Sequence, residues 1–211
     1  MRLVPAEREA LCDLFEATGP EAPTVLPGWR AEELLAHLLV RERQPLAAPG
    51  ILVPALARFA DSAMGSYAKT PWAEQVRLLR GGAPLWSPYR LAALDERANL
   101  FEFFVHHEDL ARAQPGWQPR TAQPERDEAL WSGLRLTARL MYRHSPVAVR
   151  LVHPTRERGA EISAKRGSGL VTVTGPPGEL ALHAFGRELA KVELDGAPDD
   201  VAALQATSRG L

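Results

Sequence analysis

The chain has 211 residues, of which 45% are hydrophobic and 24% are charged, and its formal net charge is −1 at pH 7. This composition is that of an ordinary globular protein with one large domain or two small ones, and it gives no electrostatic reason to expect a nucleic-acid or membrane partner. A single cysteine, Cys12, excludes an intrachain disulfide, and the first residues lack the apolar segment of a signal peptide, so we expect a cytoplasmic location.

Apolar periodicity and helix-ending residues predict a series of helices in the first two thirds of the chain. Gly19-Pro20 ends the first of them, and Thr70-Pro71 supplies an N-cap followed by proline at the first position of a later one. The expected helices cover residues 4–18, 30–44, 51–67, 71–80, about 91–113 and 125–143.

From residue 145 onward, short segments of alternating apolar and polar residues replace the long helices. They predict strands at residues 147–153, 160–164, 170–174 and 190–194, and helices at residues 179–186 and 198–206. We therefore expect an α+β protein with a helical domain at residues 1–145 and a small α+β domain at residues 146–211.

The expected helix around residues 99–113 carries an unusual polar stripe. At 3.6 residues per turn, five polar side chains fall within about 80° of one another. They are Asp95, Asn99, Glu102, His106 and Asp109. Phe and Leu residues border this stripe on both sides, which indicates that it faces the protein interior, where unpaired charges are costly and need partners.

A bound metal cation would satisfy Glu102 and His106 together, because these residues lie four apart on one helix face. His37, on the helix at residues 30–44, is a third candidate ligand, although a lone histidine among leucines is more often a hydrogen-bonded core residue. One carboxylate and two imidazoles suit Zn²⁺ and leave a coordination position open. Nickel, iron or manganese would also accept this set.

Two neighbours on the stripe keep alternative interpretations open. Asp109 could orient a metal ligand, act as a general base, or pair with Arg41 on the other helix. Asn99 could hydrogen-bond the candidate site or only the neighbouring helix. The sequence identifies no catalytic residue.

Several motifs together resemble the mycothiol-dependent maleylpyruvate isomerase family, within the wider group of DinB-like metal-binding helical bundles. They are Pro27-Gly28-Trp29, Leu34-Leu-Ala-His37-Leu, Glu102-Phe-Phe-Val-His106-His-Glu-Asp109-Leu, Gly175-Pro-Pro-Gly178-Glu-Leu and Phe185-Gly186-Arg187. The resemblance covers most of the chain. It implies an N-terminal four-helix bundle that holds a divalent metal, zinc above all, through His37, Glu102 and His106, followed by a C-terminal α+β domain like that of the isomerase.

The resemblance also implies a function. The metal would engage a low-molecular-weight thiol, mycothiol in that family, and Arg41 and Arg187 are candidates for holding the thiol or a small electrophilic substrate. We therefore expect a thiol-dependent isomerase or transferase that is a monomer or homodimer. Residues 41–45, Arg-Glu-Arg-Gln-Pro, suggest a distinct branch of the family.

Three other interpretations compete with this one. The first is a metal-dependent hydrolase in which Asp109 is the general base. The second is a non-catalytic protein with a structural metal and an apolar ligand in its C-terminal part. The third is a helical bundle in which Glu102 pairs with Arg41 and binds nothing.

Overall fold

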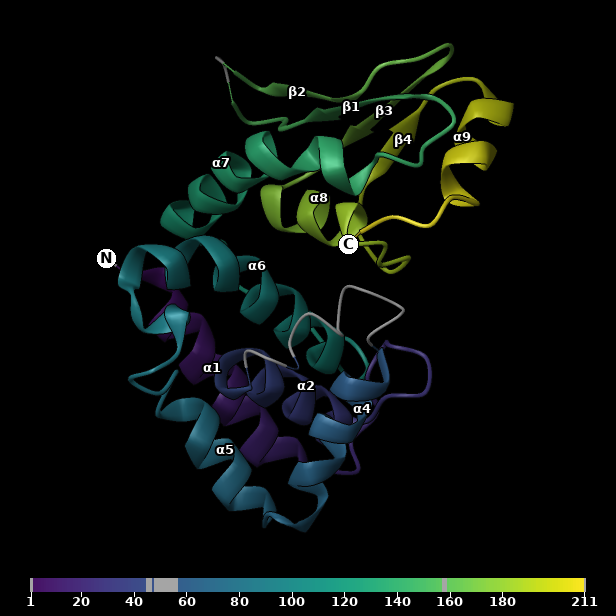
Figure 1. Ribbon diagram of the computed structural model, residues 1–211. Helices are drawn as coiled ribbons and strands as arrows, with labels where there is room; N and C mark the ends of the chain where they lie inside the picture. The colour runs from purple at the N-terminus through teal and green to yellow at the C-terminus, as the bar shows by residue number, and fades with distance from the viewer. Residues whose placement is uncertain (1, 45–46, 48–56, 157–158, 211) are drawn as a thin grey trace. The chain divides into compact units, whose positions relative to one another are not determined.

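The computed structural model describes residues 2–44, 47, 57–156 and 159–210. Its chain divides into two compact units, Met1–Arg120 and Thr121–Leu211. The described part of the first unit is helical, and the second unit combines helices with a four-stranded sheet (Figure 1). The protein is therefore a mixed α+β protein, as the sequence predicts.

The first unit is built from α-helices and short 3-10 helices. Gly19 ends the first helix with a φ of 80°, a left-handed conformation that glycine adopts without strain. The second helix begins with a 2.8 Å hydrogen bond from the Arg30 backbone N–H to the Glu33 carboxylate. The described elements are α1 (Leu3–Thr18), α2 (Ala31–Arg43), α4 (Ala57–Gly65), η2 (Ser66–Lys69), α5 (Trp72–Arg80), η3 (Pro88–Arg90) and α6 (Ala92–Ala111).

An apolar core holds these helices together. α1 packs along α6 and α5, and α2 packs against α4 and α5. Fully buried side chains fill the space between them, among them Leu11, Phe15, Leu34, Leu35, Leu79, Phe103 and Leu110. This packing leaves one face of α2 directed toward α6. The polar stripe of α6 lies on the side of that helix that faces α2.

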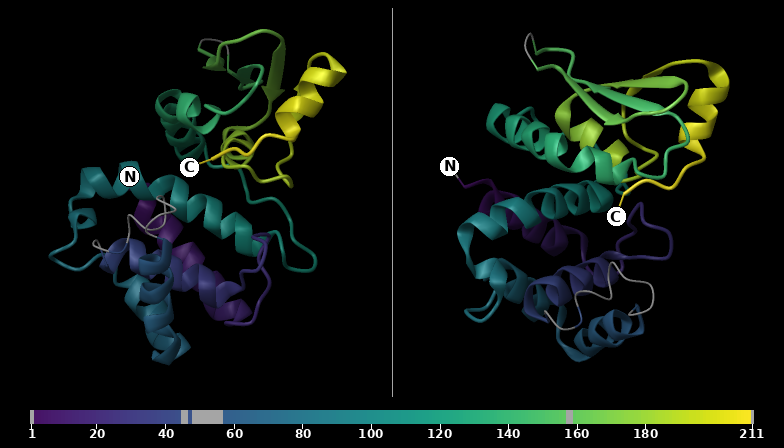
Figure 2. Two further views of the ribbon diagram at one scale, coloured as in Figure 1. Left: turned by 45° about the vertical axis from the view of Figure 1, so that its right-hand side comes forward. Right: turned by 45° about the horizontal axis from the view of Figure 1, so that its top comes forward.

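The second unit places two helices against a mixed sheet. Its elements are α7 (Pro124–Met141), β1 (Ala148–Val152), β2 (Glu161–Lys165), β3 (Leu170–Thr174), α8 (Pro177–Ala184), β4 (Glu193–Asp195) and α9 (Pro198–Gln205). The strand order is β2-β1-β3-β4, in which β1 and β3 are parallel and the outer pairs are antiparallel. In Figures 1 and 2, α7 and α8 lie on the same face of this sheet.

The strands bury alternate residues, which explains why one face of the sheet accepts helices. Val149 and Leu151 of β1 and Val171 and Val173 of β3 are buried, with more exposed residues between them. Trp131 of α7 is fully buried as well, so apolar side chains of helix and sheet form the core of this unit.

The elements lie close to where the sequence predicts them, with two differences. The last strand lies at residues 193–195 instead of 190–194. The helix predicted at 125–143 corresponds to α7, which packs against α8 and β2. It belongs to the second compact unit, whereas the sequence predicts a helical domain at 1–145 that includes it. Of the helix expected at 51–67, residues 51–56 lie outside the described residues.

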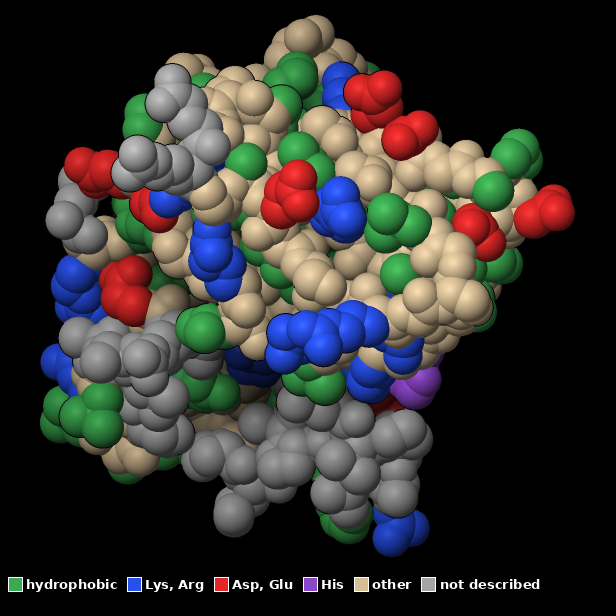
Figure 3. Space-filling view, turned by 90° about the horizontal axis from the view of Figure 1, so that it is seen from above, with side chains coloured by type: hydrophobic (Ala, Val, Ile, Leu, Met, Phe, Trp, Pro, Cys, Tyr) green, Lys and Arg blue, Asp and Glu red, His purple; other side chains and the backbone are tan. Residues whose placement is uncertain are grey.

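The surface carries charges of both signs. Figure 3 shows acidic and basic side chains spread over one face of the molecule, in keeping with the net charge of −1. Among the described helices, none combines the length and apolar character needed to cross a bilayer.

Candidate metal centre

The polar stripe of α6 faces the interior, as predicted. Asp95, Asn99, His106 and Asp109 are all buried, and the Glu102 side chain is 13% exposed. The neighbouring apolar side chains of α6 are buried too, so the stripe lies within apolar surroundings. They include Leu100, Phe101, Phe103, Phe104 and Val105.

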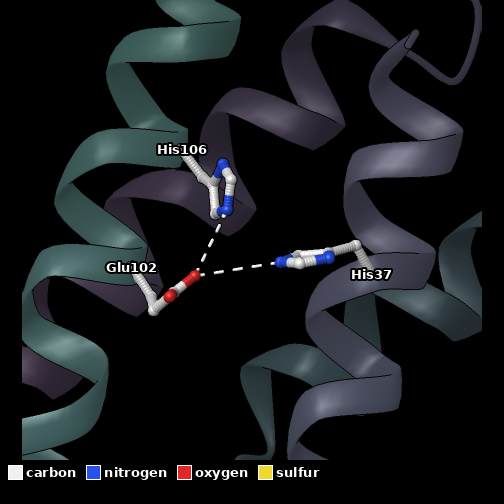
Figure 4. Close-up of side chains that lie close together, drawn as sticks. All are labelled: His37, Glu102 and His106. Atoms are coloured by element: carbon white, nitrogen blue, oxygen red, sulfur yellow. Dashed lines mark ion pairs between the residues drawn. The ribbon is translucent and has the colours of Figure 1, made fainter. Parts of the chain in front are cut away.

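The fold brings His37, Glu102 and His106 together. Glu102 and His106 project from successive turns of α6, and His37 approaches from α2 (Figure 4). Glu102 Oε2 lies 3.3 Å from His106 Nε2 and 3.8 Å from His37 Nε2. One potential ligand atom from each residue lies within 4.8 Å of the other two.

This geometry fits a single metal ion. Two donor atoms that bind one zinc ion at about 2.0–2.2 Å in tetrahedral geometry lie about 3.4 Å apart, close to both distances measured from Glu102. His37 Nε2 is buried and, among the described residues, has no hydrogen-bond partner. A buried imidazole nitrogen without a partner is unfavourable unless another species binds it. The three residues therefore form a candidate site for a cation.

The electrostatics of the triad give its members different protonation states. Burial lowers the pKa of His37 below its usual range, which favours the neutral imidazole with a free lone pair. Burial alone would raise the pKa of Glu102, but contacts with His106 and His37 and the charge of Arg41 outweigh it and hold that pKa well below its usual value. Glu102 is thus a carboxylate at neutral pH.

Asp109 orients His106. Its fully buried carboxylate oxygen lies 2.9 Å from Nδ1 of His106. Burial lowers the pKa of His106, but hydrogen bonding to Asp109 and Glu102 outweighs this effect and the net shift is upward. Because an ionised carboxylate only accepts hydrogen bonds, Nδ1 carries the proton and Nε2 points toward Glu102. Of the roles considered for Asp109, this contact matches orientation of a ligand.

Arg41 contacts the candidate ligand itself. Its Nη1 donates a 2.8 Å hydrogen bond to Glu102 Oε1, and its Nη2 donates a 3.2 Å hydrogen bond to Asn99 Oδ1. The other carboxylate oxygen, Oε2, faces the two histidines. Arg41 and Asn99 thereby fix the orientation of Glu102.

A buried polar network that the sequence does not predict extends from Asn99 away from the triad. The Asn99 amide donates to Asp95 at 2.8 Å and to Glu42 at 3.4 Å. Glu42 accepts two 2.6 Å hydrogen bonds from Arg8, which also reaches Asp95 at 3.4 Å. The signal in the sequence was an arginine on the otherwise apolar side of the first helix.

Aromatic and backbone contacts support the site from the other side. The Trp29 ring lies 5.3 Å from the His37 ring, centroid to centroid, and the His37 and His106 rings lie 5.1 Å apart and nearly perpendicular. The Val25 N–H donates to the Asp109 carbonyl at 2.9 Å. The segment that carries Pro27-Gly28-Trp29 is thus packed beside the triad.

Arg187 belongs to the second unit. Its Nη1 donates a 2.7 Å hydrogen bond to the Phe185 carbonyl, just after α8. Its role as a thiol- or substrate-binding residue stays a prediction from sequence.

The fold and the site define an α+β protein whose helical unit holds a buried two-histidine, one-carboxylate candidate metal centre. No protein-family model, curated protein or solved structure matches the chain.

Proposed function

We propose that this protein binds one divalent metal ion through His37, Glu102 and His106. The observation that carries the proposal is the buried Nε2 of His37, which lacks a hydrogen-bond partner among the described residues and lies beside an ionised carboxylate and an oriented imidazole. Zinc is the metal that this donor set suits best.

The charge of the buried network favours a divalent ion. The connected carboxylates, Glu42, Asp95, Glu102 and Asp109, carry four negative charges when ionised. The two guanidinium groups that contact them, Arg8, which is buried, and Arg41, whose side chain is 11% exposed, carry two positive charges. Arg2 also reaches Asp95, but its side chain is 55% exposed and largely solvated. A bound divalent cation, with both histidines neutral, would bring the net charge of this network to zero. A network with no net charge costs less free energy to bury than a charged one.

The resemblance extends the proposal to a thiol-dependent isomerase or transferase, with a DinB-like arrangement of the first unit. A bound zinc ion supplies Lewis acidity, which lowers the pKa of a thiol at the coordination position that three protein ligands leave open. The chain's own residues hold the site: Asp109 keeps the proton on Nδ1 of His106, and Arg41 holds Glu102. Mycothiol as the thiol, and a cytoplasmic location, rest on the resemblance and on the unpaired, buried Cys12.

The Trp29 ring, which packs against His37, also lines a cavity that none of the three triad residues lines. The cavity has a volume of about 440 Å³, and both Trp29 and Ala36, the residue before His37, line it. Three carboxylate residues line it as well, Glu32, Glu33 and Asp61, and its described lining includes no lysine or arginine. A substrate that occupied this cavity would be neutral or cationic, because the three carboxylates would repel a dicarboxylate such as maleylpyruvate.

The hydrolase alternative is less favoured, because Asp109 is fully buried and engaged with His106, which leaves it poorly placed to accept a proton from water. The simplest alternative is a bundle that binds no metal. The 2.8 Å contact between Arg41 and Glu102 is the observation in its favour.

Metal analysis separates these alternatives. The wild-type protein, purified without added chelator, should contain about one equivalent of zinc or another divalent metal by mass spectrometry, and His37→Ala and Glu102→Ala should contain little. His107→Ala is the matched control, because His107 follows His106 on α6 but points in another direction. Folded wild-type protein that takes up no divalent metal on reconstitution would contradict the proposal.

A further inference from the structure

A cavity rich in positive charge lies in the second unit, between the last turns of α7 and the strand β2. We call it the basic cavity. Its volume is about 350 Å³, and it is lined by Arg139, Arg143, Ser163, Ala164, Lys165 and Arg166. In Figure 1, α7 runs alongside β2, which is one of the two edge strands of the sheet. One wall therefore comes from the end of a helix and the turn after it, and the other from a strand and the turn that follows it.

Basic residues from two separate parts of the chain line this cavity. Arg139 lies in the last turn of α7, which ends at Met141, and Arg143 lies in the turn that follows the helix. In β2, Ile162 and Ala164 are buried, whereas Ser163 and Lys165 lie on the other, more exposed face of the strand. The lining therefore includes four basic residues and one serine, contributed by the end of α7, the turn after it, β2 and the turn after β2.

No carboxylate lines the basic cavity, and within the described part of the chain none of its four cations forms an ion pair. Arginines elsewhere in this protein contact carboxylates closely, as Arg8, Arg41 and Arg120 do. The chain as a whole carries a net charge of −1. Concentration of unpaired positive charge in one cavity of a nearly neutral protein creates a local positive potential that attracts anions.

Two of the four basic side chains, Arg143 and Lys165, are held by hydrogen bonds that use only some of their N–H donors. Arg143 Nη1 donates to the carbonyls of Leu140 at 2.9 Å and Gly210 at 2.8 Å. Lys165 Nζ donates to the Arg143 carbonyl at 2.8 Å. An ammonium group has three donors and a guanidinium group has five, so both retain N–H groups for a ligand. Fixing these side chains in advance reduces the entropy lost on binding.

We propose that the basic cavity binds a small molecule that bears a phosphate group. Guanidinium groups recognise phosphate by paired hydrogen bonds, and the donors of four cations exceed what the two oxygens of one carboxylate can accept. The volume corresponds to about a dozen water molecules at ~30 Å³ each, enough for a phosphate and a small organic part. This site is separate from the metal centre and does not depend on it.

The competing explanation is that the basic side chains protect β2. Edge strands expose unpaired N–H and C=O groups, and lysine or arginine beside them prevents pairing with another chain. That role requires positive charge but no saturable site, so a binding measurement separates the two explanations.

The test is calorimetric titration of the full chain with pyrophosphate and with inorganic phosphate at low ionic strength. Arg139→Gln/Arg166→Gln removes two exposed cavity charges, and Arg58→Gln/Arg77→Gln removes two exposed charges in the other unit as a matched control. We expect saturable pyrophosphate binding that weakens by about tenfold or more in the cavity variant and stays within about twofold in the control.

Backbone amide chemical shifts, measured by NMR, locate the pyrophosphate-binding site. On addition of pyrophosphate, the backbone amides of Ser163 and Lys165 should shift in the wild type and not in the cavity variant, whose circular dichroism should match that of the wild type. Lack of saturable binding at millimolar phosphate and pyrophosphate would overturn the proposal. So would an equal loss in the control variant, or binding of a single-stranded oligonucleotide without binding of pyrophosphate.

Discussion

The buried carboxylate of Asp109 lies 2.9 Å from Nδ1 of His106, and this contact turns Nε2 of the same ring toward Glu102. The pair links a residue outside the triad to one inside it. Carboxylates that hold the far nitrogen of a metal-binding histidine fix the tautomer and the ring orientation, and their removal weakens metal binding.

Asp109→Asn should therefore lower zinc affinity by about 10- to 100-fold, because the amide no longer fixes the proton on Nδ1. Competition with a chromophoric chelator measures this affinity. Asp13→Asn, an exposed carboxylate on α1, is the control. An affinity of Asp109→Asn equal to that of the wild type would show that Asp109 does not support the site.

Arg41→Met should destabilise the metal-free protein by about 3–5 kcal/mol, because Glu102 and Asn99 lose the guanidinium between them in a largely buried position. Added zinc should recover part of this loss, since the ion supplies positive charge to Glu102. Urea unfolding with and without zinc measures both effects. A loss below about 1 kcal/mol would place this pair among ordinary surface ion pairs.

Arg8→Met should destabilise the protein by a similar amount, about 3–5 kcal/mol, because it leaves Glu42 as an unpaired buried carboxylate. The double variant Arg8→Met/Glu42→Met should recover most of that loss, since apolar side chains of similar volume replace the buried pair. Urea unfolding of the two single variants and the double variant gives the coupling. If the losses in the free energy of unfolding of the two single variants simply added in the double variant, the pairing of Arg8 with Glu42 would be contradicted.

His183 should make stability depend on pH. It is buried beside the Tyr142 hydroxyl, 2.6 Å from Nδ1, and burial lowers its pKa to about 3. In the unfolded chain a histidine has a pKa of about 6.5, so between about pH 6.5 and 3 the unfolded chain binds a proton that the folded protein does not. The contribution of His183 to the free energy of unfolding is therefore greatest above about pH 6.5 and falls as the pH drops toward 3.

The expected slope from His183 is about 1.4 kcal/mol per pH unit between roughly pH 6 and 4. Comparison of urea unfolding for the wild type and His183→Gln isolates this contribution, because the other titrating groups are common to both. Parallel pH profiles for the two proteins would rule out a buried neutral His183.

Cys12 should be unreactive in the folded protein. Its side chain is fully buried in α1, and burial raises its pKa to about 12, so almost no thiolate is present at neutral pH. A chromogenic disulfide reagent should label Cys12 only after the protein unfolds, and Cys12→Ala should keep full metal content. Rapid labelling of the native protein would show that the α1 packing opens readily.

The sequence was most informative where one helix carries the information. Glu102 and His106 are four residues apart, so their shared direction and inward orientation follow from helical periodicity and from the flanking Phe and Leu residues. His37 could be added only as a hypothesis, because its distance from α6 depends on how two helices pack.

Features that depend on tertiary packing were harder to predict. The network through Arg8, Glu42 and Asn99 joins three helices whose register the sequence does not specify. The parallel pairing of β1 with β3, with β2 at the edge, requires a chain crossing that alternation alone cannot show. The grouping of α7 with the sheet depends on its buried Trp131 and neighbouring apolar residues, which have the same periodicity as those of a bundle helix.

The most direct measurement of the central claim is anomalous diffraction from crystals grown with zinc, with data collected on both sides of the zinc absorption edge. We predict one strong anomalous peak about 2.0–2.2 Å from Nε2 of His37, Nε2 of His106 and a carboxylate oxygen of Glu102. A well-ordered triad with no peak between these atoms, and with Glu102 held by Arg41 alone, would contradict the account.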